Sequence, residues 1–175
     1  INTSSLLWYR KNLPRLIRAF YICKSKGVIN HKLVITGKRG EAYDEIVSLI
    51  KSLNLEKDVI LTGYISTEDM PILLSGADAL AFPSLHEGFG LPILEAMACG
   101  CPVITSNCSA MPEVSEDAGI LVNPYNEKDI ANAIKQVLTD TEYRNRFRNA
   151  GLEQAKRFSW ENTAGETLQV FESLR

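Results

Sequence analysis

The sequence predicts an α/β domain built on a doubly wound parallel sheet, with helices covering both faces of the sheet. Short apolar, β-branched segments alternate along the 175 residues with segments of helical periodicity, and this alternation is typical of parallel sheets. The strand segments are also almost continuously apolar, as strands covered on both faces are. Together the two observations favour a single open sheet with crossover helices.

Five segments have strand character: residues 32–36, 59–62, 79–82, 102–105 and 119–122. Apolar residues at helical spacing predict one helix around residues 13–20 and a second around residues 46–53. Further helices are predicted at residues 68–75, 92–99, 127–138, 142–157 and 160–174. The last helices have no strand between them, so we expect them to pack at an edge of the domain or to reach towards another domain.

Several residues have the chemistry of helix boundaries. Asn12 and Asn126 precede helical segments and are good N-caps, and Thr139 with Glu142 matches a capping box. Gly100 follows the segment at 92–99, where a glycine commonly ends a helix.

Composition and charge exclude several classes of protein. A content of 45% hydrophobic and 23% charged residues is that of a globular chain, not of a disordered one. The net charge of −2 argues against a general nucleic-acid binder, which is usually basic. The apolar runs are too short to span a membrane. The chain begins with Ile1 and has no signal-like segment, so we expect a fragment of a longer protein.

The four cysteines follow neither a disulfide framework nor a zinc-binding spacing. We therefore expect reduced, mostly buried thiols that pack as small hydrophobic side chains, and a cytoplasmic protein. No metal site is predicted.

A glycine-containing loop joins the strand that ends at Phe82 to the next helix. Gly88 and Gly90 allow a ligand to approach the backbone closely, and Pro92 suits the first helical position. The free amides of the loop and the positive end of the helix dipole would then form an anion site suited to phosphate. An ordinary tight turn between strand and helix is the alternative.

Two basic pairs are expected at the same edge of the sheet as this loop. Arg10 and Lys11 precede the first helix, and Lys38 and Arg39 lie between two glycines after a strand. Cations oppose the dipole at a helix N-terminus, at a cost of a few tenths of a kcal/mol each. One such pair alone would be read as solvated surface, but two pairs beside a glycine loop favour a polyanionic ligand. Neither a P-loop nor a G-x-G-x-x-G motif is present, so we expect a nucleotide bound in another way.

Two carboxylates complete this group. Glu87 lies in the glycine loop, and Glu95 lies about one turn into the following helix. From there the carboxylate of Glu95 could accept hydrogen bonds from a vicinal diol, which sugars and riboses offer. A solvated helical glutamate at position 95 and a loop or capping residue at position 87 are the alternatives. His86 could touch the same ligand or face solvent.

Glu87 and Glu95 form an E-x7-E motif inside residues 86–100, and this stretch resembles the donor-binding C-terminal domain of family-four retaining glycosyltransferases of GT-B architecture. The stretch is highly specific for that family. The Arg-Lys-Asn and Gly-Lys-Arg-Gly segments are similar to a branch rich in mannosyltransferases. Weaker matches lie at residues 10–12, 16–17, 19–20, 37–40, 63–64, 77–79, 102–106, 112–114 and 158–161.

The resemblance implies roles for individual residues. Arg10 and Lys11 would hold the donor diphosphate, Glu95 the ribose hydroxyls and Glu87 the donor sugar, which makes Arg10, Lys11 and Glu87 the candidate catalytic residues. Further donor contacts are implied for Lys38, Gly63, Tyr64, Ile65, Gly88, Phe89, Gly90 and Leu91. Gly63, Tyr64 and Ile65 would lie beside the base. The backbone amides of the glycine loop would face the sugar and the phosphates.

The resemblance also implies a Rossmann-like fold and a metal-independent hexosyl transfer from a GDP- or UDP-sugar, with no cofactor. Residues 1–158 would form the donor domain and residues 159–175 a helix that packs towards a missing N-terminal acceptor domain. That second domain would bind a saccharide or lipid-linked acceptor, and the whole enzyme could lie at the inner face of a membrane. Alone, the fragment should bind donor and transfer little.

The sequence leaves open the opening element of the domain and the choice between two classes of function. In the family the domain opens with a strand and a glycine loop, but residues 1–9 contain no glycine, so that element is either absent or altered. The alternative function, from another class, is a non-catalytic nucleotide or nucleotide-sugar sensor module. The residues of this chain do not separate such a module from half of an enzyme.

Overall fold

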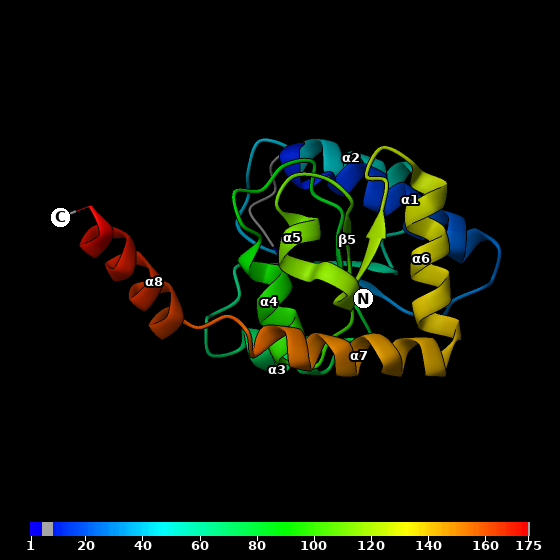
Figure 1. Ribbon diagram of the computed structural model, residues 1–175. Coiled ribbons are helices and arrows are strands. Elements are labelled where there is room, and N and C mark those ends of the chain that lie inside the picture. The colour runs from blue at the N-terminus through cyan, green and yellow to red at the C-terminus, as the bar shows by residue number, and fades with distance from the viewer. Residues whose placement is uncertain (5–8, 175) are drawn as a thin grey trace.

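A six-stranded parallel sheet forms the centre of the protein in the computed structural model, which describes residues 1–4 and 9–174 (Figure 1). The strands are β1 (Asn2–Ser4), β2 (Leu33–Thr36), β3 (Val59–Gly63), β4 (Leu80–Phe82), β5 (Val103–Ser106) and β6 (Gly119–Val122). Their order is β3-β2-β1-β4-β5-β6, and each neighbouring pair is parallel. The doubly wound sheet predicted from the sequence is confirmed. Its order reverses between β1 and β4, which is where such sheets bind ligands.

Helices connect the strands. They are α1 (Leu13–Ser25), α2 (Tyr43–Ser52), α3 (Met70–Ser75), α4 (Leu91–Ala98), α5 (Met111–Ser115), α6 (Glu127–Thr139), α7 (Thr141–Ala155) and α8 (Trp160–Ser173), with 3₁₀ turns η1 (Tyr9–Lys11) and η2 (Glu116–Ala118). The predicted helices are present with boundaries shifted by one to two residues at most ends. The short helix α5 was not predicted.

Two hydrophobic layers cover the sheet. On one face, side chains of α1, α2 and α6 such as Phe20, Ile46 and Ile134 pack on strand residues such as Ile35. On the other face, α4 and α5 pack on β4 and β5, with Met97 among the buried residues. α7 packs across α4 and α6. Because helices cover both faces of the sheet, a ligand can reach the sheet only at the ends of its strands.

The opening strand of the domain is present. β1 lies in the middle of the sheet and pairs with both β2 and β4, although its sequence Asn-Thr-Ser is polar and short. Residues 5–8, where the glycine loop of the family would follow, lie outside the described residues.

Helix caps differ from two of the predictions. Asn126 caps α6 as predicted, because its side chain accepts hydrogen bonds from the amides of Lys128 and Asp129. The predicted capping box at Thr139 is wrong, since α6 runs through Thr139 and Asp140 caps α7. Asn12 precedes α1 but makes no side-chain cap. Its backbone is left-handed, with φ of 60°, and its side chain points elsewhere, as described below.

α8 stands apart from the rest of the protein (Figure 1). None of its residues is buried, and its large apolar side chains are exposed. Of the two predicted placements, the helix therefore reaches outwards and does not pack at an edge. No helix among the described residues is long and apolar enough to cross a membrane.

All four cysteines are free thiols. Cys23 and Cys101 are buried, while Cys99 and Cys108 are half-buried. Burial raises the pKa of the Cys101 thiol to about 12, so it packs as an apolar group, as predicted.

Candidate functional site

A compact charged cluster lies where β1 and β4 end at the carboxyl edge of the sheet. The Nζ of Lys11 lies 2.7 Å from Oε1 of Glu87, and a guanidinium nitrogen of Arg10 lies 2.7 Å from Oε2. The hydroxyl of Ser84 donates to Oε1 at 2.7 Å. Lys11, Ser84 and Glu87 are each at most 9% exposed. The three predicted catalytic residues are thus brought together, with Ser84 as a fourth member that the sequence did not indicate.

Burial and pairing compete in setting the pKa values in this cluster. Burial alone would raise the pKa of Glu87, but hydrogen bonds from Lys11, Ser84 and Arg10 together outweigh it and lower this pKa below its usual value. Burial lowers the pKa of Lys11, and Glu87 offsets part of that change. Glu87 is therefore a carboxylate at neutral pH, shared between two cations.

Backbone contacts fix this cluster in place. The carbonyl of Arg10 accepts a hydrogen bond from the amide of Leu85 and lies 2.9 Å from the hydroxyl of Ser84, whose single proton it shares with Oε1 of Glu87. Arg10 also donates to the carbonyl of His86. The buried side chain of Asn12 donates to the carbonyls of Pro83 and Pro124 at 3.0 and 2.7 Å. Asn12 therefore fastens the loop before α1 to the loops after β4 and β6, instead of capping the helix.

Ser109 joins the cluster from the loop after β5. Its hydroxyl donates to the carbonyl of Glu87 at 2.7 Å, accepts from the amide of Glu87 at 3.2 Å and lies 3.2 Å from Nδ1 of His86. The backbone of Ser109 is left-handed, with φ of 57°. The sequence did not indicate Ser109, because it lies 22 residues from Glu87 in a segment without a glycine.

The glycine loop leads directly into α4. Gly90 immediately precedes the helix with φ of 104°, a conformation that favours glycine. A Cβ at Gly90 would also meet Ile93 at 3.1 Å, whereas one at Gly88 would meet nothing within 4 Å. No side chain caps α4. Pro92 has no N–H and the amide of Ile93 donates to the carbonyl of Gly90 at 2.9 Å, so the amide of Leu91 is the donor of the first turn that remains for an anion. Pro92 lies in the first turn.

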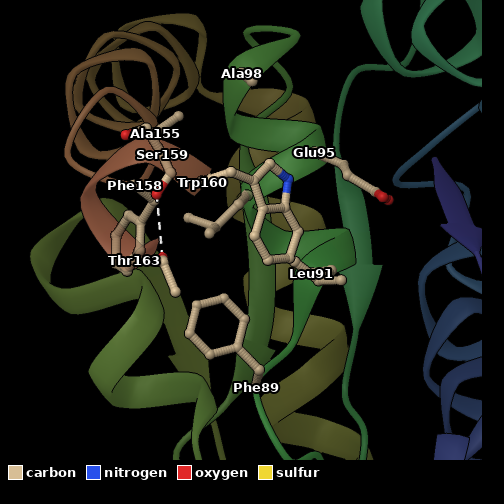
Figure 2. Close-up of a pocket in the computed structure, with 10 residues that line it drawn as sticks. Phe89, Leu91, Glu95, Ala98, Ala155, Phe158, Ser159, Trp160 and Thr163 are labelled. Atoms are coloured by element: carbon tan, nitrogen blue, oxygen red, sulfur yellow. Dashed lines mark hydrogen bonds between the residues drawn. The ribbon is translucent and has the colours of Figure 1, made fainter. Parts of the chain in front are cut away.

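Glu95 lines an apolar pocket of about 360 Å³ between α4 and the start of α8 (Figure 2). Phe89 and Leu91 of the glycine loop and helix start lie on one side, with Phe158 and Trp160 on the other. The rings of Phe89 and Phe158 meet edge to face at 6.0 Å. Figure 2 shows the exposed carboxylate of Glu95 directed away from Trp160 and out of the pocket.

The second basic segment lies at the other side of the site, after β2. The amide of Gly37 donates to the carbonyl of Gly63 at 2.8 Å, which ties the loops after β2 and β3 together. The Nζ of Lys38 then lies 5.1 Å from the centre of the Tyr64 ring. Both side chains are exposed, and the adjacent Ile65 is half-buried. Lys38, Gly63 and Tyr64 are thus neighbours, as a shared ligand contact requires.

Among the described residues, no three His, Cys, Asp or Glu side chains gather as potential metal ligands. Cationic side chains and the amide of Leu91 are the groups that this edge of the sheet offers to a ligand.

The sequence pattern of the family described as glycosyl transferases group 1 matches residues 3–154 of the chain. The O-antigen chain mannosyltransferase B of Escherichia coli is 38% identical over 165 residues, which cover 94% of this chain and 43% of that protein. The chain thus spans less than half the length of this relative.

Solved structures share the fold. The Anabaena protein Alr3699/HepE in complex with UDP and glucose has a TM-score of 0.88 and 26% identity, over 98% of this chain and 47% of that one. The C-terminal domain of a glycosyl transferase group 1 protein, LpcC of Francisella tularensis, has a TM-score of 0.78 and 26% identity over 89% of this chain and 84% of that one.

Proposed function

Because the chain belongs to the glycosyl transferases group 1 family, we propose that it is the nucleotide-sugar-binding half of a retaining glycosyltransferase that uses no metal ion. The donor is a GDP- or UDP-hexose, with mannose favoured by the 38% identical mannosyltransferase. The acceptor is a saccharide or a lipid-linked saccharide, bound by a second half of a longer enzyme. We place that enzyme in the cytoplasm, where nucleotide sugars are made.

One observation carries this proposal: Arg10 and Lys11 converge with Glu87 beside the uncapped N-terminus of α4. Two cations beside the glycine loop and the amide of Leu91 at the start of α4 suit a diphosphate. Glu87 neutralises one of the two positive charges, so the cluster keeps one net positive charge for the ligand.

The chemical role follows from this placement. In glycosyl transfer the bond between the sugar and the diphosphate breaks, and negative charge develops on the departing phosphate oxygen. Arg10, Lys11 and the amide of Leu91 at the start of α4 stabilise this charge without a metal ion. Glu95 holds the ribose, and Glu87 and the loop amides hold the sugar. A donor phosphate oxygen receives the proton of the acceptor, so no protein nucleophile is needed.

Titration calorimetry of the 175-residue chain with GDP and UDP tests the proposal. We expect binding that persists in excess chelator, and loss of binding in the chelator would contradict the metal-independent mechanism. Arg10→Ala should weaken the diphosphate by about 10- to 150-fold, the range of a hydrogen bond to a charged group. The free nucleoside should lose far less.

A matched control is Arg18→Ala, because Arg18 is an exposed arginine on α1 whose nearest carboxylate, on Glu127, lies 3.9 Å away. This variant should bind as the unchanged chain does. Equal losses for nucleoside and diphosphate in Arg10→Ala would place Arg10 away from the phosphates.

A further inference from the structure

Ser109 holds the segment of His86 and Glu87 through a single oxygen atom. Three atoms of that segment surround its hydroxyl: the carbonyl oxygen of Glu87 at 2.7 Å, the amide nitrogen of Glu87 at 3.2 Å and Nδ1 of His86 at 3.2 Å. The role of His86 was left open by the sequence, and its imidazole is exposed at the edge of the charged cluster.

The number of available protons determines the form of the imidazole. A serine hydroxyl carries one proton, and a carbonyl oxygen can only accept, so the proton of Ser109 goes to the carbonyl of Glu87. The third contact is a hydrogen bond only if Nδ1 of His86 carries a proton and donates it to the serine oxygen. A neutral imidazole has one N–H, so Nε2 of His86 then presents an unprotonated lone pair.

Glu87 has little capacity left for a sugar. A carboxylate offers about four acceptor positions, and Lys11 and Arg10 fill two of them. The hydroxyl of Ser84 lies against a third, 2.7 Å from Oε1, and its single proton is shared with the carbonyl of Arg10. One position, on Oε2, remains for a hydroxyl group. A hexose carries several neighbouring hydroxyls, so a second acceptor near Glu87 is needed to recognise more than one of them.

We propose that His86, fixed with its proton on Nδ1 by Ser109, is a specificity-determining residue whose Nε2 accepts a hydrogen bond from a hydroxyl of the donor sugar. Ser109 is the positioning residue for this contact. The inference rests on the proposed function for its ligand, but the state of the imidazole can be measured without any ligand.

The first test is ¹⁵N NMR of the histidine rings at a pH where they are neutral. The chain has two histidines, so His31→Gln assigns the signals of His86. We expect His86 to carry its proton on Nδ1, against the preference of a free imidazole for Nε2. Ser109→Ala and Ser109→Gly should both return His86 towards the Nε2–H form. Retention of Nδ1–H in both variants, or a predominantly Nε2–H ring in the unchanged chain, would overturn the assignment.

Two variants of Ser109 are needed because its backbone is left-handed. Alanine removes the hydroxyl and keeps the strained conformation, whereas glycine removes the hydroxyl and relieves the strain. An effect that both variants share comes from the hydroxyl.

The second test measures how much the sugar adds to binding, as the ratio of the Kd of a nucleoside diphosphate to that of its nucleotide sugar. GDP with GDP-mannose, and UDP with UDP-glucose, are the probes. His86→Ala should lower this ratio by about 2- to 12-fold, the value of one hydrogen bond, and leave the Kd of the nucleoside diphosphate unchanged. The Ser109 variants should lower the ratio in the same direction.

His31→Ala is the matched control, because His31 lies before β2 and contacts Asp78 at 3.6 Å, away from the cluster. A sugar contribution that is equal in His86→Ala and in the unchanged chain, with normal diphosphate binding, overturns this inference alone. Absence of diphosphate binding in the unchanged chain overturns the proposed function and the sugar contact together, while the NMR result still decides the role of Ser109.

Discussion

The two sides of the candidate site are built in opposite ways. At the buried corner, formed by Arg10, Lys11, Ser84 and Glu87, every charge is paired within the protein and only Arg10 is substantially exposed, at 39%. Lys38, Tyr64, Leu91 and Glu95 come from the loops after β2 and β3 and from α4, and together we call them the open flank. Their side chains are all exposed, with Tyr64 at 63% and Leu91 at 47%.

Because of this difference, substitutions at the two regions should affect stability and binding to different degrees. Residues of the buried corner stabilise the fold and, in the proposed function, also contact the ligand, so a substitution there should change both stability and binding. Residues of the open flank have few neighbours to lose, and surface substitutions usually alter stability by less than about 0.5 kcal/mol. A loss of binding at the open flank therefore reports on the ligand directly.

The largest effect is expected for Lys11→Met, which keeps the aliphatic stem and removes the charge. Loss of one partner from a buried ion pair costs about 3–5 kcal/mol of unfolding free energy, and Arg10 remains beside Glu87, so we expect the lower end of this range. Urea denaturation measures it. Lys38→Met is the control at the open flank, and equal stability losses in both variants would show that the two sides do not differ.

Acid should remove the stabilisation by Glu87. Its pKa is lowered in the folded protein, so its stabilising contribution is complete above the unfolded pKa of about 4.3 and is lost as the pH falls through the folded pKa. Glu87→Gln should be less stable than the unchanged chain at pH 7, and the difference should shrink below about pH 4.3. Urea denaturation at a series of pH values measures this.

The control for the acid experiment is Glu95→Gln, since the carboxylate of Glu95 is exposed. This variant should be as stable as the unchanged chain at pH 7, as exposed substitutions usually are. A constant stability difference for Glu87→Gln from pH 7 to pH 3 would show that the pairing at the buried corner does not stabilise the carboxylate.

Glu95→Ala should affect binding and leave stability unchanged. If both ribose hydroxyls donate to this carboxylate, the variant loses about 1.5–3 kcal/mol of nucleotide affinity. A double-mutant cycle isolates the contact, with the ligand as one partner. The unchanged chain should bind the 2′-deoxynucleoside diphosphate less tightly than the ribo form, and Glu95→Ala should scarcely distinguish them. If the variant keeps the full penalty, Glu95 does not contact the ribose.

The sequence predicted Arg10, Lys11 and Glu87 of the buried corner but not the contacts between loops that hold them together. The strands and helices follow from local periodicity, and the E-x7-E segment places Glu87 and Glu95 on a loop and on α4. Ser84 and Ser109 were missed because their roles depend on contacts between loops that follow different strands, with Arg10 for Ser84 and with Glu87 for Ser109. A serine in a loop has no pattern that distinguishes a positioning residue from a solvated one.

The cap predicted at Asn12 is wrong, and the presence of β1 was left open by the sequence, for related reasons. An asparagine before a helix is usually a cap, but tertiary contacts to Pro83 and Pro124 override that preference here. β1 has only three residues and a polar sequence, so neither apolar character nor alternation marks it. β1 is recognised as a strand only from its backbone pairing with β2 and β4, which lie far from it in the sequence.

The smallest change in nucleotide affinity is expected for a substitution of Tyr64. It is also the sharpest test of whether the open flank contacts the ligand directly. If its ring lies beside the base, Tyr64→Leu should lower the affinity for a free nucleoside and for a nucleoside diphosphate by the same factor, because the contact does not involve the phosphates. The expected loss is about 0.5–1 kcal/mol, the value of an exposed aromatic contact with a π-system or cation. Tyr64→Phe keeps the ring and should bind as the unchanged chain does.

Lys38, whose Nζ lies 5.1 Å from the ring centre, offers the competing explanation: the ring could act by holding this cation for the diphosphate. A loss confined to the diphosphate in Tyr64→Leu, and matched by a loss of diphosphate affinity in Lys38→Met, would favour that route and move the base away from Tyr64.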